Sequence, residues 1–154
     1  MRLRILVAGM LAAGVALIPT VAAAKGAKEM TVSGPGLAAP IRLANTGDGM
    51  SPNTIAEKSG LFDSTADRRL AARPPGRLGP RYVATYQWLV DVNRTTPLRQ
   101  ELYPFAAGGA VIRITRDQRV LDAPIARGWY RARPELTLLL VAAGVPGPNR
   151  APAV

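Results

Sequence analysis

Cysteine and histidine are both absent from this sequence of 154 residues. Without cysteine the chain can form neither a disulfide nor a thiolate nucleophile, so apolar burial and hydrogen bonds must hold the fold together. Without histidine it lacks the commonest general base, the commonest transition-metal ligand and the side chain that normally titrates near neutral pH. These absences exclude thiol chemistry and many familiar active sites, and we expect neither a metal nor a cofactor.

Lysine is scarce, and the motifs that depend on it are missing. The chain has only Lys25, Lys28 and Lys58, and none follows a serine at the spacing that gives a serine nucleophile a lysine base. Residues 108–109 are a glycine pair without the Lys-Ser/Thr of a phosphate-binding loop. The segment 45–49 has too few carboxylates for a calcium loop, so we interpret it as an ordinary turn.

The N-terminus has the pattern of a secretory signal. Arg2 and Arg4 precede an apolar stretch, 5–21, which ends in three alanines before Lys25. A basic start, an apolar centre and a small-residue end are the three parts of a signal peptide, so we predict that residues 1–24 are removed on export. The alternative is a retained anchor, because the apolar stretch is near the lower length limit for a membrane span. Either way we expect a secreted or cell-envelope protein.

Positive charge is in excess. The formal net charge is +10, and loss of Arg2 and Arg4 with the signal lowers it to +8. A basic surface attracts polyanions, which outside the cytoplasm are acidic wall polymers, anionic lipid headgroups or extracellular DNA. The composition offers another explanation, because arginine, alanine, glycine and proline are abundant together, as in proteins from GC-rich genomes.

The exported part has the length of one domain. We predict a single basic α+β domain over residues 25–146, built mainly from antiparallel strands, and a disordered tail at 147–154. The clearest strand is 82–92, where aromatic and β-branched side chains alternate with polar ones. A turn at 93–97 would connect it to a returning strand at 98–103 as a hairpin. The other expected strands are the pair 29–33 and 41–43, and the segments 111–114 and 120–121.

Capping signals predict two helices. Ser51 before a proline, with Gly60 at the other end, indicates a helix over 52–59. A proline and an acidic residue begin a leucine-rich segment that we expect to be helical over 134–143. Between the first helix and the long strand, residues 64–80 have no apolar period and two proline breaks, which predicts a basic surface loop.

Two acidic residues are the candidates for catalysis. Asp91 and Glu101 fall on the two arms of the expected hairpin, and paired carboxylates divide acid and base work in glycoside hydrolysis. Arg94 and Arg99 lie among them, so cross-strand ion pairing is the simpler interpretation. An envelope-polymer hydrolase therefore stays an alternative to a protein without catalytic residues.

Aromatic residues gather in the second half of the chain. Core packing accounts for most of them, because a small domain without disulfides needs large apolar side chains inside. Trp129 and Tyr130 stand among arginines, and this pattern suits stacking on sugars or bases, so we expect them to be exposed. The candidate binding residues are Arg68, Arg69, Arg73, Arg77, Arg127, Trp129, Tyr130, Arg131 and Arg133.

Four segments carry a resemblance to a known group of proteins. They are 31–37 (TVSGPGL), 78–82 (LGPRY), 101–109 (ELYPFAAGG) and 128–132 (GWYRA). In these segments the chain resembles small exported actinobacterial proteins of unknown function. The resemblance implies an envelope or extracellular location and one small domain, and it implies no activity, ligand or catalytic residue.

These observations favour a binding protein over an enzyme. We expect non-enzymatic binding of an anionic envelope component, with no nucleic acid partner and membrane contact only through an uncleaved signal. The third possibility is an inhibitor or accessory subunit of another exported protein, which would dock through the proline-rich segment 73–80.

Overall fold

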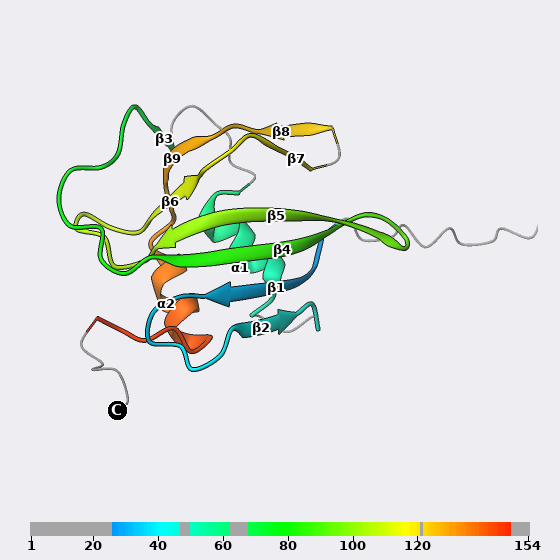
Figure 1. The fold of residues 1–154 in the computed structure, drawn as a ribbon, viewed down its shortest axis with the longest axis horizontal. Coiled ribbons are helices and arrows are strands. Elements are labelled where there is room, and N and C mark those ends of the chain that lie inside the picture. Colours follow the sequence, from blue (N-terminus) through cyan, green and yellow to red (C-terminus); the bar gives the residue numbers. More distant parts are fainter. Residues whose placement is uncertain (1–25, 47–49, 62–67, 121, 149–154) are drawn as a thin grey trace, which may run out of the picture.

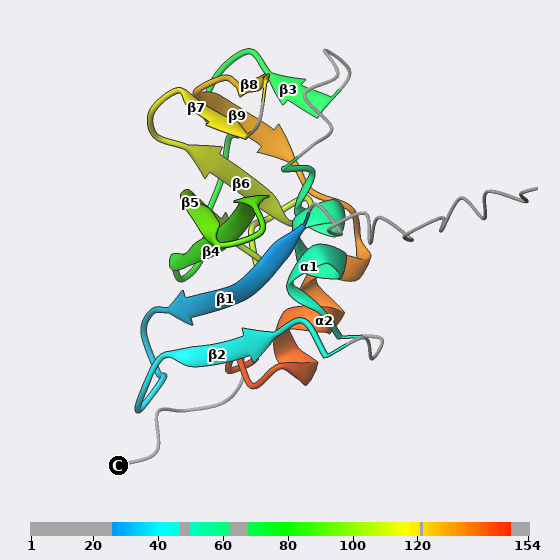
Figure 2. The ribbon, with the colours of Figure 1, turned by 90° about the vertical axis from the view of Figure 1, so that its right-hand side faces the viewer.

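A seven-stranded antiparallel sheet forms the centre of the fold, and both helices lie on one of its faces (Figure 1, Figure 2). The predicted fold class, a small α+β domain built mainly from antiparallel strands, is confirmed. The computed structural model describes residues 26–46, 50–61, 68–120 and 122–148. The predicted signal, residues 1–24, and positions 149–154 of the predicted tail lie outside the described residues.

The sheet has the strand order β2, β1, β4, β5, β6, β9, β3, and every neighbouring pair is antiparallel. Strands β7 and β8 form a separate two-stranded hairpin. The strands are β1 Ala27–Ser33, β2 Ile41–Ala44, β3 Arg69–Leu70, β4 Tyr82–Asp91, β5 Arg94–Tyr103, β6 Val111–Ile114, β7 Gln118–Val120, β8 Ala123–Ile125 and β9 Gly128–Arg131. The two predicted hairpins, β1 with β2 and β4 with β5, are confirmed.

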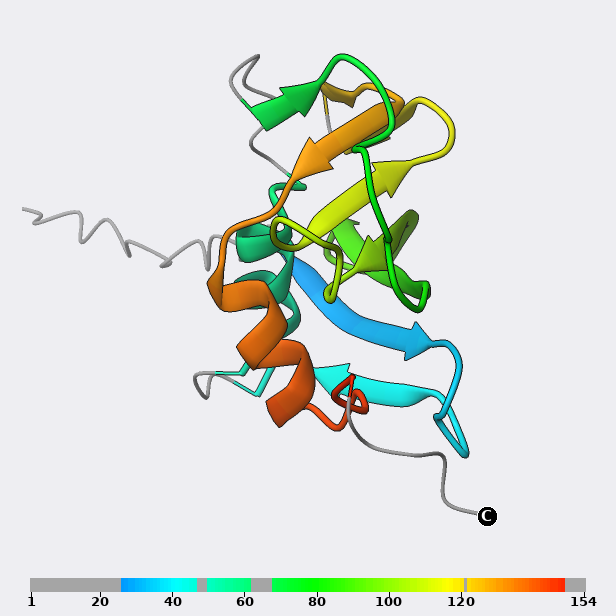
Figure 3. The same ribbon diagram turned by 90° about the vertical axis from the view of Figure 1, so that its left-hand side faces the viewer.

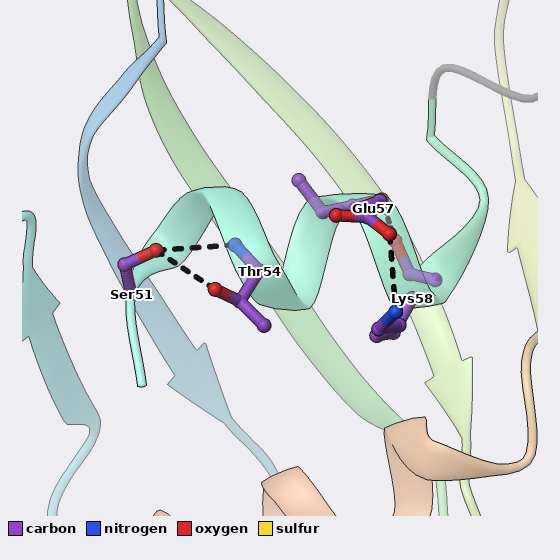
Figure 4. Close-up of polar contacts among 6 residues, drawn as sticks. Ser51, Thr54, Glu57 and Lys58 are labelled. Atoms are coloured by element: carbon purple, nitrogen blue, oxygen red, sulfur yellow. Dashed lines mark hydrogen bonds and ion pairs between the residues drawn. The ribbon is translucent and has the colours of Figure 1, made fainter. Parts of the chain in front are cut away.

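The first helix, α1 (Pro52–Ser59), begins and ends where its capping pattern predicts. The Ser51 hydroxyl accepts a hydrogen bond from the Thr54 backbone N–H at 3.2 Å, and the two hydroxyls lie 3.0 Å apart (Figure 4). At the other end Gly60 has φ 77°, a left-handed conformation that a side chain would strain. Its N–H donates to the Glu57 carbonyl at 3.0 Å, so both ends of the helix are capped.

The core lies between the sheet and the two helices. The second helix, α2 (Glu135–Ala142), was predicted over 134–143 and covers this face together with α1. A polar link crosses the core, because the Gln100 side-chain amide donates to the Tyr86 hydroxyl at 2.6 Å and to the Ser59 hydroxyl at 2.8 Å. No helix in the described ranges is long and apolar enough to cross a bilayer. The largest fully buried side chains are Met30, Val32, Ile55, Leu61, Tyr82, Tyr86, Leu98, Gln100, Leu102, Ile112, Leu136 and Leu140.

Strand β5 starts earlier than predicted. It begins at Arg94, so the turn is the two residues 92–93, and Pro97 lies inside the strand. Arg99 directs its backbone N–H and C=O away from β4 to the Gln118 side chain, at 2.6 and 2.7 Å. Alternate residues of a strand direct these groups the same way, so the missing N–H of Pro97 falls on the same open side. The proline therefore removes no bond from the ladder.

Three strands, β3, β8 and β9, lie in segments with no predicted strand, and two of them, β3 and β9, belong to the main sheet. β3 interrupts the predicted loop 64–80, of which positions 64–67 lie outside the described residues. β3 and β9 are short and pair with distant parts of the chain, so no local alternation of apolar and polar residues indicates them. On β9 Tyr130 points into the core and is only 4% exposed, so its predicted exposure is wrong. Its neighbour Trp129 points to the opposite face, because side chains alternate along a strand.

Candidate binding surface around Trp129

The sheet face away from the helices carries charged and aromatic side chains near the β3 edge. On β6 and β9 the residues that face the core are Ile112, Ile114 and Tyr130, so their neighbours in the strand face outward. The strand register sets Glu101 opposite Arg113, and Arg113 opposite Trp129. Residues from three distant parts of the sequence thus meet on one surface.

The Trp129 indole lies over a small second hydrophobic cluster on this outer face. Its ring centroid is 5.4 Å from that of Tyr103, with an angle of 41° between the planes. Leu70 and Leu78 pack against the same cluster. The Arg113 guanidinium carbon lies 5.4 Å from the centroid of the indole, within the range of a cation–π contact. Tyr103 is 8% exposed, whereas Trp129 is half-buried and reaches solvent.

The segment 71–81, between β3 and β4, runs along the side of the sheet away from the helices (Figure 3). Because Leu78 and Gly79 line a groove together with Trp129, the segment forms a wall beside the indole. The Ala107 N–H donates to the Arg77 carbonyl at 2.8 Å, which fixes the segment to the turn after β5. Gly79 has φ 71°, and a Cβ there would lie 3.2 Å from the Phe105 carbonyl oxygen. A side chain at this position would be strained and would crowd the Phe105 carbonyl, so glycine is favoured at this close main-chain approach.

Two open grooves adjoin Trp129. The first groove has a volume of about 520 Å³ and the second about 350 Å³. The first is lined by Arg73, Leu78, Gly79, Tyr103, Arg113 and Trp129. The second is lined by Arg69, Arg113, Ile114, Thr115, Arg127, Gly128 and Trp129. They share Trp129 and Arg113, and none of the described carboxylates lines either groove. We call Trp129 and the arginines 69, 73, 113 and 127 the Trp129 surface.

Glu101 lies beneath this surface as a buried carboxylate, 7% exposed. It accepts from Arg81 Nη1 at 2.9 Å and from the Tyr103 hydroxyl at 3.1 Å, and Arg113 Nη1 lies 3.6 Å away. Burial and the neighbouring carboxylate raise the pKa of Tyr103, which keeps this phenol protonated as a donor. These partners compensate the free-energy cost of burying the Glu101 carboxylate. Glu101 in turn holds Arg113 next to the indole.

The two candidate catalytic carboxylates lie at opposite ends of the β4–β5 hairpin. Asp91 pairs with Arg94 at the turn, whereas Glu101 pairs with Val83 at the far end. Eight residues of β4 separate these positions, or roughly 27 Å at about 3.4 Å per residue. The ion pairs of Glu101 are with Arg81 and Arg113 and not with the hairpin arginines that the sequence suggested. The two carboxylates do not form one reaction centre.

The structure brings together four of the predicted binding residues: Arg69, Arg73, Arg127 and Trp129. Arg69 Nη2 also donates to the Arg127 carbonyl at 3.2 Å, which places the two residues side by side. These four residues come from β3, the segment after it, the position just before β9, and β9 itself.

The other predicted binding residues lie elsewhere. Arg131 Nη1 donates to the Gly108 carbonyl at 3.0 Å, beside the turn after β5. Arg68 lies beside Gly60 at the end of α1. Arg133 lies between β9 and α2, Arg77 is exposed on the segment 71–81, and Tyr130 is in the core.

Two residues that line the grooves were not among the predicted binding residues. Arg113 and Tyr103 sit in strands that the sequence analysis treated as structural. A charged residue at the centre of the apolar run 111–114 is the one local signal for Arg113. Its position beside Trp129 depends on the pairing of β6 with β9, which no local pattern reveals.

Comparison of the chain with protein-family models, curated proteins and solved structures found no match in any of the three. The resemblance to small exported actinobacterial proteins therefore stays a prediction. The Trp129 surface has to be interpreted from its own chemistry.

Proposed function

We propose that the protein is a non-enzymatic binding domain for an anionic polymer of the cell envelope, which it contacts through the Trp129 surface. The observation that carries the proposal is the make-up of the two grooves. Four arginines and one indole line them, and no carboxylate does among residues 26–46, 50–61, 68–120 and 122–148. Glu101, opposite Arg113 in the strand register, is buried and already paired. The exposed Asp117 carboxylate lies beside the second groove and accepts from the Arg127 backbone N–H at 2.7 Å.

The chemistry of the lining favours anions. A guanidinium presents planar pairs of N–H donors that match the oxygens of a carboxylate or a phosphate. The indole adds apolar contact area that a purely ionic surface lacks. Both grooves are open to solvent, as expected for a segment of a chain and in contrast to the enclosed pockets that bury most of a small ligand.

The expected export of the protein and its net charge also support the proposal. The signal pattern at residues 1–24 supports export, and the net charge of +8 after its removal supports attraction to polyanions over some distance. Outside the cytoplasm, acidic wall polymers are the abundant partners of this kind. Attraction between exposed charges weakens with salt, so binding of this type depends on ionic strength.

Co-sedimentation of the purified protein with isolated cell wall, at low and at high salt, tests the proposal. Arg73→Gln with Arg127→Gln removes one arginine from each groove. We expect at least about tenfold weaker binding, since a charge-assisted hydrogen bond contributes about 1.5 kcal/mol. The matched control is Arg42→Gln with Arg94→Gln, which removes the same charge from β2 and from the start of β5.

The control pair should bind within about threefold of the unchanged protein, as expected for exposed charges outside the site. No sedimentation at low salt would refute the proposal. Equal losses in the two pairs would show that total charge and not the Trp129 surface drives binding. Circular dichroism spectra of all variants check that the fold is retained.

A further inference from the structure

Trp129 stands between the two grooves and not at the end of one. Arg73 belongs to the first groove, Arg69 and Arg127 belong to the second, and Arg113 lines both. A ligand that contacts both sets of arginines must therefore pass across the indole. A compact anion such as phosphate occupies one groove only.

The strands set the scale of this arrangement. Leu70 on β3 is paired with Trp129 on β9, and Trp129 is paired with Arg113 on β6. Neighbouring strands lie about 4.8 Å apart, so this row spans roughly 10 Å. The distance exceeds one sugar ring, and a ligand that covers it has more than one repeating unit.

We infer that the ligand is a linear acidic polysaccharide, bound with one sugar ring against the Trp129 indole and with acidic groups on both sides held by the arginines of the two grooves. The inference rests on the proposed function and narrows the anionic polymer to a sugar chain. The apolar C–H face of a sugar ring covers the indole, and its carboxylates or phosphates pair with the guanidinium groups.

The aromatic content of the surface separates a sugar chain from single-stranded nucleic acid. Proteins that bind single strands stack successive bases on several aromatic side chains. In the described part of this surface one indole reaches solvent, because Tyr103 is 8% exposed and Tyr130 is 4% exposed and turned to the core. One ring with charges on both sides fits a polymer that alternates rings and acidic groups.

The same feature separates a sugar chain from polyphosphate. Polyphosphate has no ring, so it gains nothing from the indole and binds through the arginines alone. Glu101 adds to the selectivity, because it holds Arg113 at the boundary of the two grooves, 5.4 Å from the indole centroid. The stacked ring and a flanking acidic group are thus bound next to each other.

Titration with galacturonate oligomers of one, two, four and eight units tests the inference. Affinity should rise at least about tenfold between the monomer and the length that crosses Trp129, since additional arginine contacts are then formed. Trp129→Ala should weaken the eight-unit oligomer about tenfold, as loss of a stacking contact does, and leave polyphosphate binding unchanged. Trp129→Phe keeps an aromatic ring beside Tyr103 and should restore part of the affinity.

Substitutions in the two grooves give a second measurement. Arg73→Gln and Arg127→Gln should each weaken the eight-unit oligomer, whereas at most one of them weakens the monomer. The inference is overturned if the monomer binds as tightly as the oligomer, if Trp129→Ala leaves the oligomer unaffected, or if oligo(dT) of equal charge binds more tightly. In each of these cases an anion still binds and the proposed function survives. If no polyanion binds at low salt, the proposed function fails as well.

Discussion

The buried carboxylate of Glu101 positions the side chains around it on the outer face of the sheet. Its carboxylate accepts from Arg81 and from Tyr103, and it lies 3.6 Å from Arg113. Both arginine side chains are about half exposed, so solvent screens their ion pairs with Glu101. The Tyr103 hydroxyl has less access to water, because the residue is 8% exposed.

A double-mutant cycle separates these two contributions. We expect Glu101→Ala to lower the free energy of unfolding by about 1 to 3 kcal/mol, because it leaves the buried Tyr103 hydroxyl without its acceptor. Tyr103→Phe removes that hydroxyl, so adding Glu101→Ala to it should cost clearly less. Urea unfolding of the four proteins measures both effects. Additive losses would mean that the bond from Tyr103 to Glu101 contributes nothing measurable.

At the scale of elements, β5 illustrates how an open strand edge is protected. β6 pairs only with the end of β5 from Glu101 to Tyr103, which leaves the hairpin arm exposed on that side. The Gln118 side chain binds both backbone groups of Arg99, as a neighbouring strand residue would. Beyond it Pro97 presents no N–H, so the arm offers few groups to another chain.

Replacing that proline should expose the edge. Pro97→Thr adds an N–H on the open side of β5 and leaves the pairing with β4 intact. We expect a change in unfolding free energy within about 0.5 kcal/mol and more self-association at high concentration. Light scattering measures the association, with Thr95→Val as a control that keeps every backbone donor. An unchanged monomer fraction would show that Gln118 alone protects the edge.

Local sequence patterns predict some helices and strands of this fold and miss others. Helix α1 and the strands β1 and β4 have capping residues or alternating side chains within a few positions, so the sequence predicts them closely. β3 has two residues and exists because Arg69 pairs with Tyr130, which is sixty-one positions away. Because residues 128–131 form a strand, the side chains of Trp129 and Tyr130 point to opposite faces of the sheet, although the sequence analysis expected both to be exposed. Three of the four arginines of the Trp129 surface were predicted, and Arg113 was missed because it meets them only through the pairing of β6 with β9.

At the scale of the whole molecule, stability should depend on pH through the buried tyrosines. Burial raises the pKa of Tyr86 far above the ordinary 10.0, and it raises the pKa of Tyr82 and Tyr103 as well. Above pH 10 the unfolded chain loses these protons while the folded chain keeps them. The folded state then binds more protons, so the free energy of unfolding falls as pH rises.

Tyr86→Phe tests this dependence. Near pH 8 the variant should be less stable by about 0.5 to 1.5 kcal/mol, because the Gln100 amide loses an acceptor. Between pH 9 and pH 11 the unchanged protein should lose more stability than the variant, since Tyr86 no longer titrates in the variant. Urea unfolding across this range measures both slopes. Equal slopes would show that Tyr86 does not control the alkaline limit of the fold.

The wall beside Trp129 gives the molecule one further property. Its position depends on the contact between Arg77 and Ala107 main chains and on the close approach of Gly79 to Phe105. Leu78 packs against the second hydrophobic cluster, whereas the exposed Arg73 lines the groove from the same wall. Position 73 is therefore free to change during evolution or by engineering, and the same backbone frame can present another charge or substituent beside Trp129.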